Sequence, residues 1–175
     1  MATPKPRIGM LTSGGDCPGL NAVIRAAVKT AGRLGYECLG FLRGFEGLVD
    51  PVSTMRLDAR NTADILAEGG TILGSSNRGR FAAKVGTDQR VTVDPALLDE
   101  AAATLRDLSV SGLIVIGGDG SLTMAQEFFE HGMPVVGVPK TIDNDLRATA
   151  FTFGFDSAVA TATDALDKLR TTAAS

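Results

Sequence analysis

Two acidic segments carry the residue types that could handle phosphate groups and protons. In IGGDGS, residues 116–121, glycines flank the carboxylate of Asp119. In PKTIDNDL, residues 139–146, Asp143 and Asp145 lie two positions apart. Each segment follows an apolar run, and ligands of open α/β sheets bind just beyond the carboxyl ends of such strands. Two strand ends that face one cleft would bring these three carboxylates together.

Asp119 lies inside a glycine turn, where a buried carboxylate would repel any phosphate bound beside it. Magnesium removes that repulsion, because Mg²⁺ binds through one or two carboxylates together with the phosphates of a substrate. A single aspartate is therefore enough for such a site. The structural alternative is that Asp119 caps the helix that follows the turn.

Thr141, Asp143 and Asp145 would all point to one side of an extended segment, because side chains two positions apart share a face. The resulting acidic patch would face the cleft. Three tasks suit such a patch: it could hold a second metal ion, act as a general base, or brace a turn. The residues by themselves leave all three tasks open.

Three glycine-rich turns, at 13–16, 69–80 and 117–121, lie where strands are expected to end. Glycine lets the backbone approach an anion closely, and the N–H groups at the start of the next helix are donors. The sequence contains neither GxxxxGK[ST] nor GxGxxG. We therefore expect backbone amides to hold a nucleotide, with Arg78 or Arg80 as a forked donor to phosphate oxygens. One Gly-Gly turn alone would more often be a tight chain reversal.

The elements that would position these turns alternate between strand and helix. Short apolar runs predict strands at 7–12, 37–42, 112–116 and 134–138, with a further short strand at 55–57. Apolar residues spaced three and four apart predict helices at 20–34, 95–108 and 122–131, and another that Asp156 or Ser157 caps. The helix at 95–108 is expected to have Asp94 as its N-cap and Pro95 at its first position.

The remaining stretches are expected to be less regular. Asn61 is predicted to cap a short helix that ends at Glu68, and residues 69–80 are predicted to form an exposed loop after a brief strand. The alternation as a whole predicts an α/β fold, doubly wound and mostly parallel, with helices on both faces of the sheet in three αβα layers. The strands at 112–116 and 134–138 are expected to be covered on both faces.

Composition narrows the class of protein. The 175 residues with 44% hydrophobic content fit one ordinary globular domain. A net charge of -3 with mixed signs predicts neither nucleic-acid nor membrane binding, and the apolar runs are too short to span a bilayer. We expect a cytoplasmic protein in which Cys17 and Cys38 stay reduced. The last helix runs nearly to Ser175 with no strand after it, which predicts a fragment of a longer protein or a compact product of one.

At these residues the chain closely resembles the 6-phosphofructokinase family. Five motifs occur in the family's order and spacing: LTSGGDCPGLNAVIR at 11–25, GGTILGS at 69–75, GGDGS at 117–121, PKTIDND at 139–145 and TFGFDSA at 152–158. Lipid and NAD kinases share GGDG but lack the TIDND partner. The resemblance implies an incomplete nucleotide-binding domain at 1–138 and the beginning of a domain for fructose 6-phosphate at 139–175.

The resemblance also implies an activity and a set of roles. It implies an ATP-dependent 6-phosphofructokinase of glycolysis, which transfers the γ-phosphoryl group of MgATP to O1 of fructose 6-phosphate. Asp143 resembles the general base, while Thr141 and Asp145 orient substrate and charge. The implied sugar-binding residues are Thr141, Ile142 and Asp143. The implied ATP-binding residues are Gly14, Gly15, Arg78, Gly118, Asp119, Gly120 and Ser121, with Asp119 as the magnesium ligand.

Gly120 and Lys140 bear on the phosphoryl donor. Family members that use pyrophosphate usually have a second aspartate after GGD, where an α-phosphate of ATP must pass, and Gly120 leaves that space open. Lys140 is typical of the pyrophosphate users but could serve either donor. The prediction is therefore ATP, with pyrophosphate as the alternative.

Other features of the family lie outside this chain. The resemblance implies a homo-oligomer, a dimer or tetramer, in the full-length form, and sugar-phosphate contacts beyond Ser175. A 175-residue chain that lacks those contacts would be inactive alone, so a non-catalytic nucleotide-binding fragment is a competing hypothesis. A dinucleotide-binding oxidoreductase fits the fold class but lacks GxGxxG and its acidic ribose partner.

Overall fold

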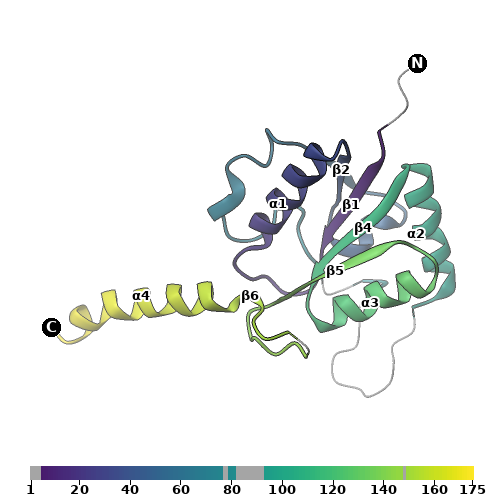
Figure 1. The fold of residues 1–175 in the computed structure, drawn as a ribbon. Coiled ribbons are helices and arrows are strands. Elements are labelled where there is room, and N and C mark those ends of the chain that lie inside the picture. Colours follow the sequence, from purple (N-terminus) through teal and green to yellow (C-terminus); the bar gives the residue numbers. More distant parts are fainter. Residues whose placement is uncertain (1–4, 77–78, 82–92, 148) are drawn as a thin grey trace.

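The computed structural model describes residues 5–76, 79–81, 93–147 and 149–175. Within these ranges, six strands form one sheet in the order β3-β2-β1-β4-β5-β6 (Figure 1). The strands are β1 Arg7–Thr12, β2 Glu37–Phe41, β3 Thr54–Leu57, β4 Val110–Gly117, β5 Val135–Thr141 and β6 Phe153–Gly154. All neighbouring strands pair in parallel except β2 and β3, which are antiparallel.

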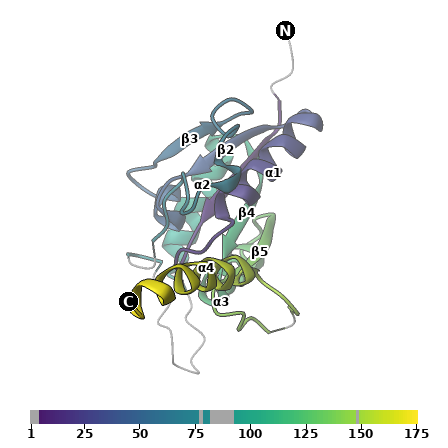
Figure 2. The same cartoon turned by 90° about the vertical axis from the view of Figure 1, so that its left-hand side faces the viewer.

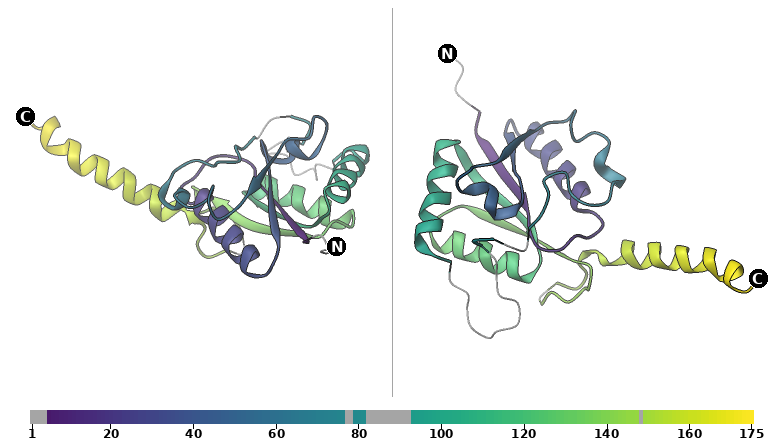
Figure 3. Two further views of the ribbon diagram at one scale, coloured as in Figure 1. Left: turned by 90° about the horizontal axis from the view of Figure 1, so that it is seen from above. Right: turned by 180° about the vertical axis from the view of Figure 1, so that it is seen from behind.

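Helices cover both faces of the sheet. They are α1 Leu20–Arg33, α2 Pro95–Asp107, α3 Asp119–Glu130 and α4 Phe155–Ala173, with 3-10 helices η1 Gly44–Leu48 and η2 Ile65–Ala67. Helix α1 lies on one face, and α2 and α3 lie on the other (Figure 3). Met10 packs into the core on the α1 side, and its neighbour Leu11 packs into the core on the α2 and α3 side. This alternation is what a strand with two buried faces requires, and the predicted doubly wound α/β fold is confirmed.

Several local signals in the sequence predicted element ends correctly. Strand β1 has the predicted bounds, and α1 begins at Leu20 as expected. Helix α2 begins at Pro95, and the carboxylate of Asp94 accepts a hydrogen bond of 2.9 Å from the N–H of Ala96. Asp94 is thus a side-chain N-cap, which pairs one of the donors that a helix start leaves unpaired.

The helix predicted to run from Asn61 to Glu68 is wrong. The side chain of Asn61 instead accepts from the N–H of Asp58 at 2.8 Å and donates to the carbonyl of Arg56 at 2.7 Å. The carboxylate of Asp58 accepts from the N–H groups of Asn61 and Arg60, and these bonds lower its pKa below the usual value. The side chains of Asp58 and Asn61 thus bind backbone groups in a polar turn, and these groups do not form helical hydrogen bonds. The 3-10 helix η2 that follows has only three residues.

The expectation of an exposed loop at 69–80 after a brief strand is also wrong where the structure describes it. Residues 69–76 form no strand, and Leu73 is only 1% exposed. Thr12 donates to the carbonyl of Gly74 at 2.8 Å, and the N–H of Arg43 donates to the carbonyl of Leu73 at 2.9 Å. Leu73 fits over Gly40, where a Cβ atom would collide with it. Leu73 therefore anchors the loop in the core, while Gly69, Gly79 and Arg80 are exposed.

Strand β5 is less covered than its apolar run predicts. Val136 is 63% exposed, because α1 packs over β1 and β2 and leaves β5 open on that side. The strand continues to Thr141, and Lys140 and Thr141 pair with the short, unpredicted β6. The division into domains at 138 and 139 stays a prediction.

Helix α4 extends away from the body of the protein (Figures 1 and 3), and it points toward the viewer in Figure 2. It begins at Phe155 after Gly154, whose φ is 104°, so the predicted caps Asp156 and Ser157 lie inside the first turn instead. No residue of α4 is buried. In the described part of the chain, no helix is long and apolar enough to cross a membrane.

Candidate active site

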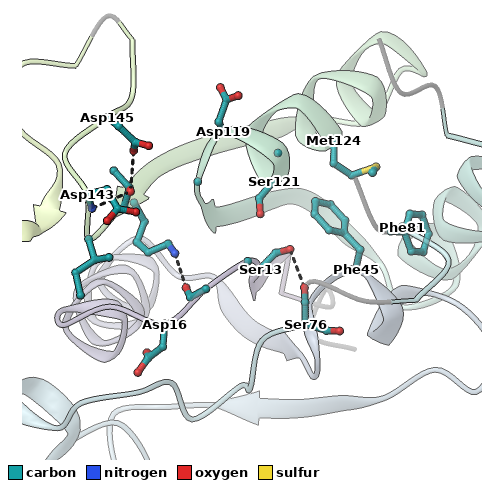
Figure 4. A pocket seen from close by; sticks show the side chains of 17 residues that line it. Ser13, Asp16, Phe45, Ser76, Phe81, Asp119, Ser121, Met124, Asp143 and Asp145 are labelled. Atoms are coloured by element: carbon teal, nitrogen blue, oxygen red, sulfur yellow. Dashed lines mark hydrogen bonds between the residues drawn. The ribbon is translucent and has the colours of Figure 1, made fainter. Parts of the chain in front are cut away.

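A cavity of about 360 Å³ opens at the carboxyl ends of β1, β4 and β5 (Figure 4). Its size is typical of a small-molecule site. The residues that follow these three strands, including the first turns of α3, supply most of its lining. The cavity thus lies at the edge of the sheet where the sequence predicted ligand binding.

The GGDGS segment forms the start of α3 instead of a loop before it. Gly118 is the N-cap, and the N–H of Leu122 donates to its carbonyl at 2.9 Å. The N–H groups of residues 119–121 therefore have no carbonyl within the helix to pair with, and Gly118 to Ser121 line the cavity. Such a helix start favours phosphate binding.

Asp119 differs in two ways from the prediction. Its side chain is exposed and not buried, and it is the first residue of α3, so the alternative of an N-cap is wrong. Its carboxylate lines the cavity and, in Figure 4, points away from the helix. An exposed carboxylate beside the first helical N–H groups can share a cation with a bound phosphate.

The SGGD loop is held on both sides. The N–H of Ser13 donates to the carbonyl of Ile116 at 2.9 Å, and the N–H of Gly14, with φ 85°, donates to the carbonyl of Ser76 at 3.4 Å. Lys140, which is 4% exposed, donates from Nζ to the carbonyl of Gly15. The loop after β1 is therefore linked to strand β5 by the buried side chain of Lys140 at the cavity wall.

After Thr141 the PKTIDND segment is a turn and not the extended stretch that the alternation predicted. Strand β5 ends at Thr141, and Asn144 has φ 52°, in the left-handed region. The hydroxyl of Thr141 donates to the carboxylate of Asp145 at 2.9 Å and accepts from the N–H of Asp143 at 3.1 Å. Both carboxylates still line the cavity, because Thr141 holds the turn closed.

Hydrogen bonds from Thr152 hold the same turn. Thr152 is buried, and its hydroxyl donates to the carbonyl of Thr141 at 3.0 Å. Its N–H donates to the side chain of Asn144 at 3.0 Å. The TIDND and TFGFDSA motifs are thus adjacent in space, and the second supports the first.

The cavity has a polar end and an apolar end (Figure 4). Asp143 and Asp145 lie at the polar end, while Phe45, Phe81 and Met124 line the other. The rings of Phe45 and Phe81 have centroids 5.8 Å apart, and both contact Phe128 beneath them. A molecule whose anionic groups lie over the start of α3, between the two ends, and whose flat apolar group lies at the aromatic end would match this lining.

Nearly all of the predicted site residues line this one cavity. They are Gly14, Gly15, Gly118, Asp119, Gly120, Ser121, Lys140, Thr141, Ile142, Asp143 and Asp145. Arg78 lies outside the described residues. Arg80, the other candidate for a phosphate contact, does not line the cavity, and its guanidinium binds Glu46 and the carbonyl of Asp50.

Sequence reasoning missed the apolar end. Phe45 follows the end of β2, at the same edge of the sheet as the glycine turns, and that position could have identified it. Met124 lies three residues after Ser121 and so shares its helix face. Phe81 offered no such signal, because it follows a loop and no periodic element.

One thiol lies behind the cavity wall. Cys17 is 2% exposed and follows Asp16, which lines the cavity. Burial raises the pKa of the Cys17 thiol, and the charge of Lys140 partly opposes that rise. Burial likewise raises the pKa of Cys38, and both cysteines are free.

Comparison with known proteins agrees with this geometry. The sequence matches the Phosphofructokinase family over residues 7–175. It is 50% identical to ATP-dependent 6-phosphofructokinase of Chloroflexus aggregans over 175 residues, which are all of this chain and 48% of that protein. It is 47% identical to pyrophosphate–fructose 6-phosphate 1-phosphotransferase of Amycolatopsis methanolica, over 97% of this chain and 46% of that protein.

Solved structures give the same result. Phosphofructokinase of Saccharomyces cerevisiae superposes with a TM-score of 0.79 at 29% identity, covering 97% of this chain and 24% of that one. The chain spans about half the length of the curated relatives it matches. The matches extend over the glycine turns and the TIDND turn, and the chain belongs to the phosphofructokinase family.

Proposed function

We propose that the protein is an ATP-dependent 6-phosphofructokinase, which transfers the γ-phosphoryl group of ATP to O1 of fructose 6-phosphate. The observation that supports this most is that one cavity has the N–H groups of a helix start at its centre, carboxylates at one end and aromatic rings at the other. ATP carries matching groups, with phosphates beside a flat base. Family membership and the printed activity of the Chloroflexus aggregans relative support the same proposal.

The nucleotide would bind across the middle of the cavity. Its phosphates would meet the N–H groups of residues 119–121 and the Gly14–Gly15 loop, while its base would pack against Phe45 and Met124. Phosphoryl transfer depends mainly on in-line positioning and on neutralising the phosphate oxygens. The rigid links around this cavity suit that task, because Lys140 and Ser76 fix the glycine loop.

Asp143 would act as the general base. In this role its carboxylate takes the proton from the O1 hydroxyl as that oxygen attacks the γ-phosphorus atom, and the bond from phosphorus to the β,γ-bridging oxygen breaks to release ADP. The turn suits this role, since the carboxylate of Asp143 lines the cavity while its N–H is held by Thr141. Asp145 would keep Thr141 in place by accepting a hydrogen bond from its hydroxyl group.

Asp119 would be the protein's ligand for Mg²⁺. The described residues hold no group of three or more histidine, cysteine or acidic side chains that could bind a metal alone. A single exposed carboxylate fits magnesium, which takes one or two carboxylates and completes its shell with phosphates and water. When bound, the ion neutralises oxygens of the triphosphate. A cytoplasmic location and a homo-oligomeric assembly remain expectations from the sequence.

Pyrophosphate is the second candidate donor. The relative from Amycolatopsis methanolica that is named for pyrophosphate is nearly as similar as those named for ATP, and Lys140 is buried at the cavity wall. The choice between donors therefore depends on Gly120, which lies in the first turn of α3 and lines the cavity. An aspartate there would bring a negative charge and added bulk to the phosphate path.

A paired assay tests the proposal. Initial rates with fructose 6-phosphate are measured for the protein in its natural length and for the 175-residue chain, with ATP or pyrophosphate as donor. We expect higher rates with ATP from the natural-length protein. Gly120→Asp is expected to lower the rate with ATP by at least about tenfold, because like charges in the cavity repel.

Two outcomes would contradict the proposal. Faster turnover with pyrophosphate than with ATP would overturn the donor, and no turnover with either would overturn the activity. Asp107→Asn, a change of one charge at an exposed position of α2, is the control for general effects of net charge. Turnover by the 175-residue chain alone at an enzymatic rate would contradict the hypothesis that sugar-phosphate contacts lie beyond Ser175.

A further inference from the structure

Glu46 holds a segment that is distant in sequence against the apolar end of the cavity. Its Oε1 atom accepts from the N–H of Arg80 at 2.6 Å and from the N–H of Phe81 at 3.3 Å. Its Oε2 atom accepts from Nε of Arg80 at 3.2 Å. The guanidinium of Arg80 also donates to the carbonyl of Asp50 at 3.0 Å. We call Glu46 and the residues 79–81 that it binds the Glu46 clamp.

The clamp determines where an aromatic ring enters the cavity wall. Glu46 is next to Phe45 in η1, and it binds the backbone of Phe81 directly. The rings of Phe45 and Phe81 are both nearly buried, with centroids 5.8 Å apart, and both line the cavity. One carboxylate thus connects the two aromatic residues of the apolar end.

Gly79 provides a second observation for the clamp. Its φ of 113° is a conformation that side chains rarely adopt. A Cβ atom at this position would lie 2.7 Å from Cδ of Glu46, so any larger residue would push the carboxylate away. The close approach of Glu46 to this backbone therefore requires glycine.

The clamp is more than a surface ion pair. The side chain of Glu46 is 22% exposed, against 41% for Arg80, so the carboxylate is the more buried partner. An exposed ion pair contributes little to stability, but a carboxylate that also accepts two backbone N–H bonds makes stronger, charge-assisted contacts. Glu46 thus holds the backbone of residues 80 and 81, while the ring of Phe81 packs on Phe45 and Phe128.

We propose that Glu46 is a positioning residue for the nucleobase of the donor. It holds Phe81 in the apolar wall, and so it favours a donor that carries a base over a bare polyphosphate. This inference rests on the proposed function, because it assumes that a nucleotide occupies the cavity. Glu46 touches neither phosphate nor sugar in this role and acts only through Phe81.

Binding of two ligands to the 175-residue chain tests the inference. Isothermal titration calorimetry measures the Kd of MgATP and of magnesium tripolyphosphate, which has three phosphates and no base. Glu46→Ala is expected to raise the Kd of MgATP about tenfold, a factor that corresponds to about 1.4 kcal/mol of binding free energy. The Kd of tripolyphosphate is expected to change less than about twofold, because its contacts lie at the helix start and glycine loop.

Two more variants separate positioning from folding. Glu46→Gln keeps an oxygen for the backbone N–H groups but loses the ion pair. Its Kd for MgATP is therefore expected to lie between that of the unmodified chain and that of Glu46→Ala. Gly79→Ala would displace the carboxylate of Glu46, and it is expected to raise the Kd of MgATP in the same way as Glu46→Ala. Glu37→Ala is the matched control, because Glu37 pairs with Arg7 and Arg56 away from the cavity.

Each failure has a distinct meaning. Unchanged MgATP binding in Glu46→Ala, or equal weakening of both ligands in Glu46→Gln, would overturn the inference and leave the proposed function standing. Equal affinity of the unmodified chain for MgATP and tripolyphosphate would also overturn the inference and leave the proposed function standing, since the base would then add nothing to the affinity. Binding of neither ligand by the unmodified chain would overturn the proposed function and this inference together.

Discussion

At the scale of residues, Thr141 organises the acidic turn. Its hydroxyl accepts from the N–H of Asp143 and donates to Asp145, while its carbonyl accepts from Thr152. Asp145 and Asp143 thus have different surroundings. The carboxylate of Asp145 is engaged by Thr141, whereas Asp143 uses its backbone for the turn and presents its side chain at the cavity. This difference favours Asp143 as the proton acceptor in the proposed reaction.

Asp143→Asn tests that assignment in the protein of natural length. We expect kcat to fall by about 10² to 10⁴, the contribution of a positioned general base, because an amide cannot take up the proton. The KM for ATP is expected to stay nearly unchanged, since the nucleotide contacts other residues. Asp145→Asn, which keeps an oxygen for Thr141, is expected to cause a smaller loss. A kcat within about tenfold of the unmodified enzyme in Asp143→Asn would contradict the assignment.

At the scale of elements, helices α2 and α3 differ in how their first N–H groups are paired. Helix α3 begins at Asp119 with no side-chain cap, so its first N–H groups are available to an anion. Helix α2 begins with the side-chain cap Asp94, and its start lies away from the cavity lining. The start of α2 is therefore paired by a side chain, whereas the start of α3 presents N–H groups without a side-chain cap at the cavity.

Asp94→Ala tests the stabilising role of the capped start. The free energy of unfolding is expected to fall by about 1 kcal/mol, since the N–H of Ala96 loses its acceptor. Urea unfolding followed by circular dichroism measures the change. Asp107→Ala removes an acidic residue from the other end of α2, where the helix dipole disfavours negative charge, and is expected to cause no loss. Equal losses in both variants would show that net charge, and not capping, is responsible.

The elements also explain which features the sequence could predict. Apolar runs, glycine turns and the cap at Asp94 are local signals, and they located most strands, most helices and the polar end of the site. The apolar end depends on contacts between distant segments, such as Glu46 with Phe81, which no spacing encodes. The turn at Asn61 was missed because its polar side chains bind the local backbone in place of a helix.

At the scale of the whole molecule, two regions differ in how they are stabilised. The sheet with α1, α2 and α3 encloses two hydrophobic clusters, one on each face. Helix α4 contributes to neither cluster and extends from the body (Figure 1). Most of the stability of a protein helix comes from tertiary packing, and the 19 residues of α4 have little of it. The ion pair of Lys168 with Asp164 adds a few tenths of a kcal/mol at most, about the value of an i,i+4 pair.

The apolar stripe of α4 gives the last prediction. Val159, Leu166 and Leu169 lie on one helix face and are 48%, 69% and 62% exposed. Uncovered apolar surface favours association, so the 175-residue chain is expected to self-associate as its concentration rises. Leu166→Glu combined with Leu169→Glu is expected to give a monomer, because burying two carboxylates in a contact is costly.

Sedimentation velocity over a range of concentrations measures this association. Thr161→Glu combined with Thr171→Glu is the matched control, since it adds the same two charges on the opposite face of α4. If the apolar stripe drives association, this control is expected to associate like the unmodified chain. A monomeric unmodified chain at all concentrations, or equal dissociation by both pairs of substitutions, would show that the stripe is not responsible.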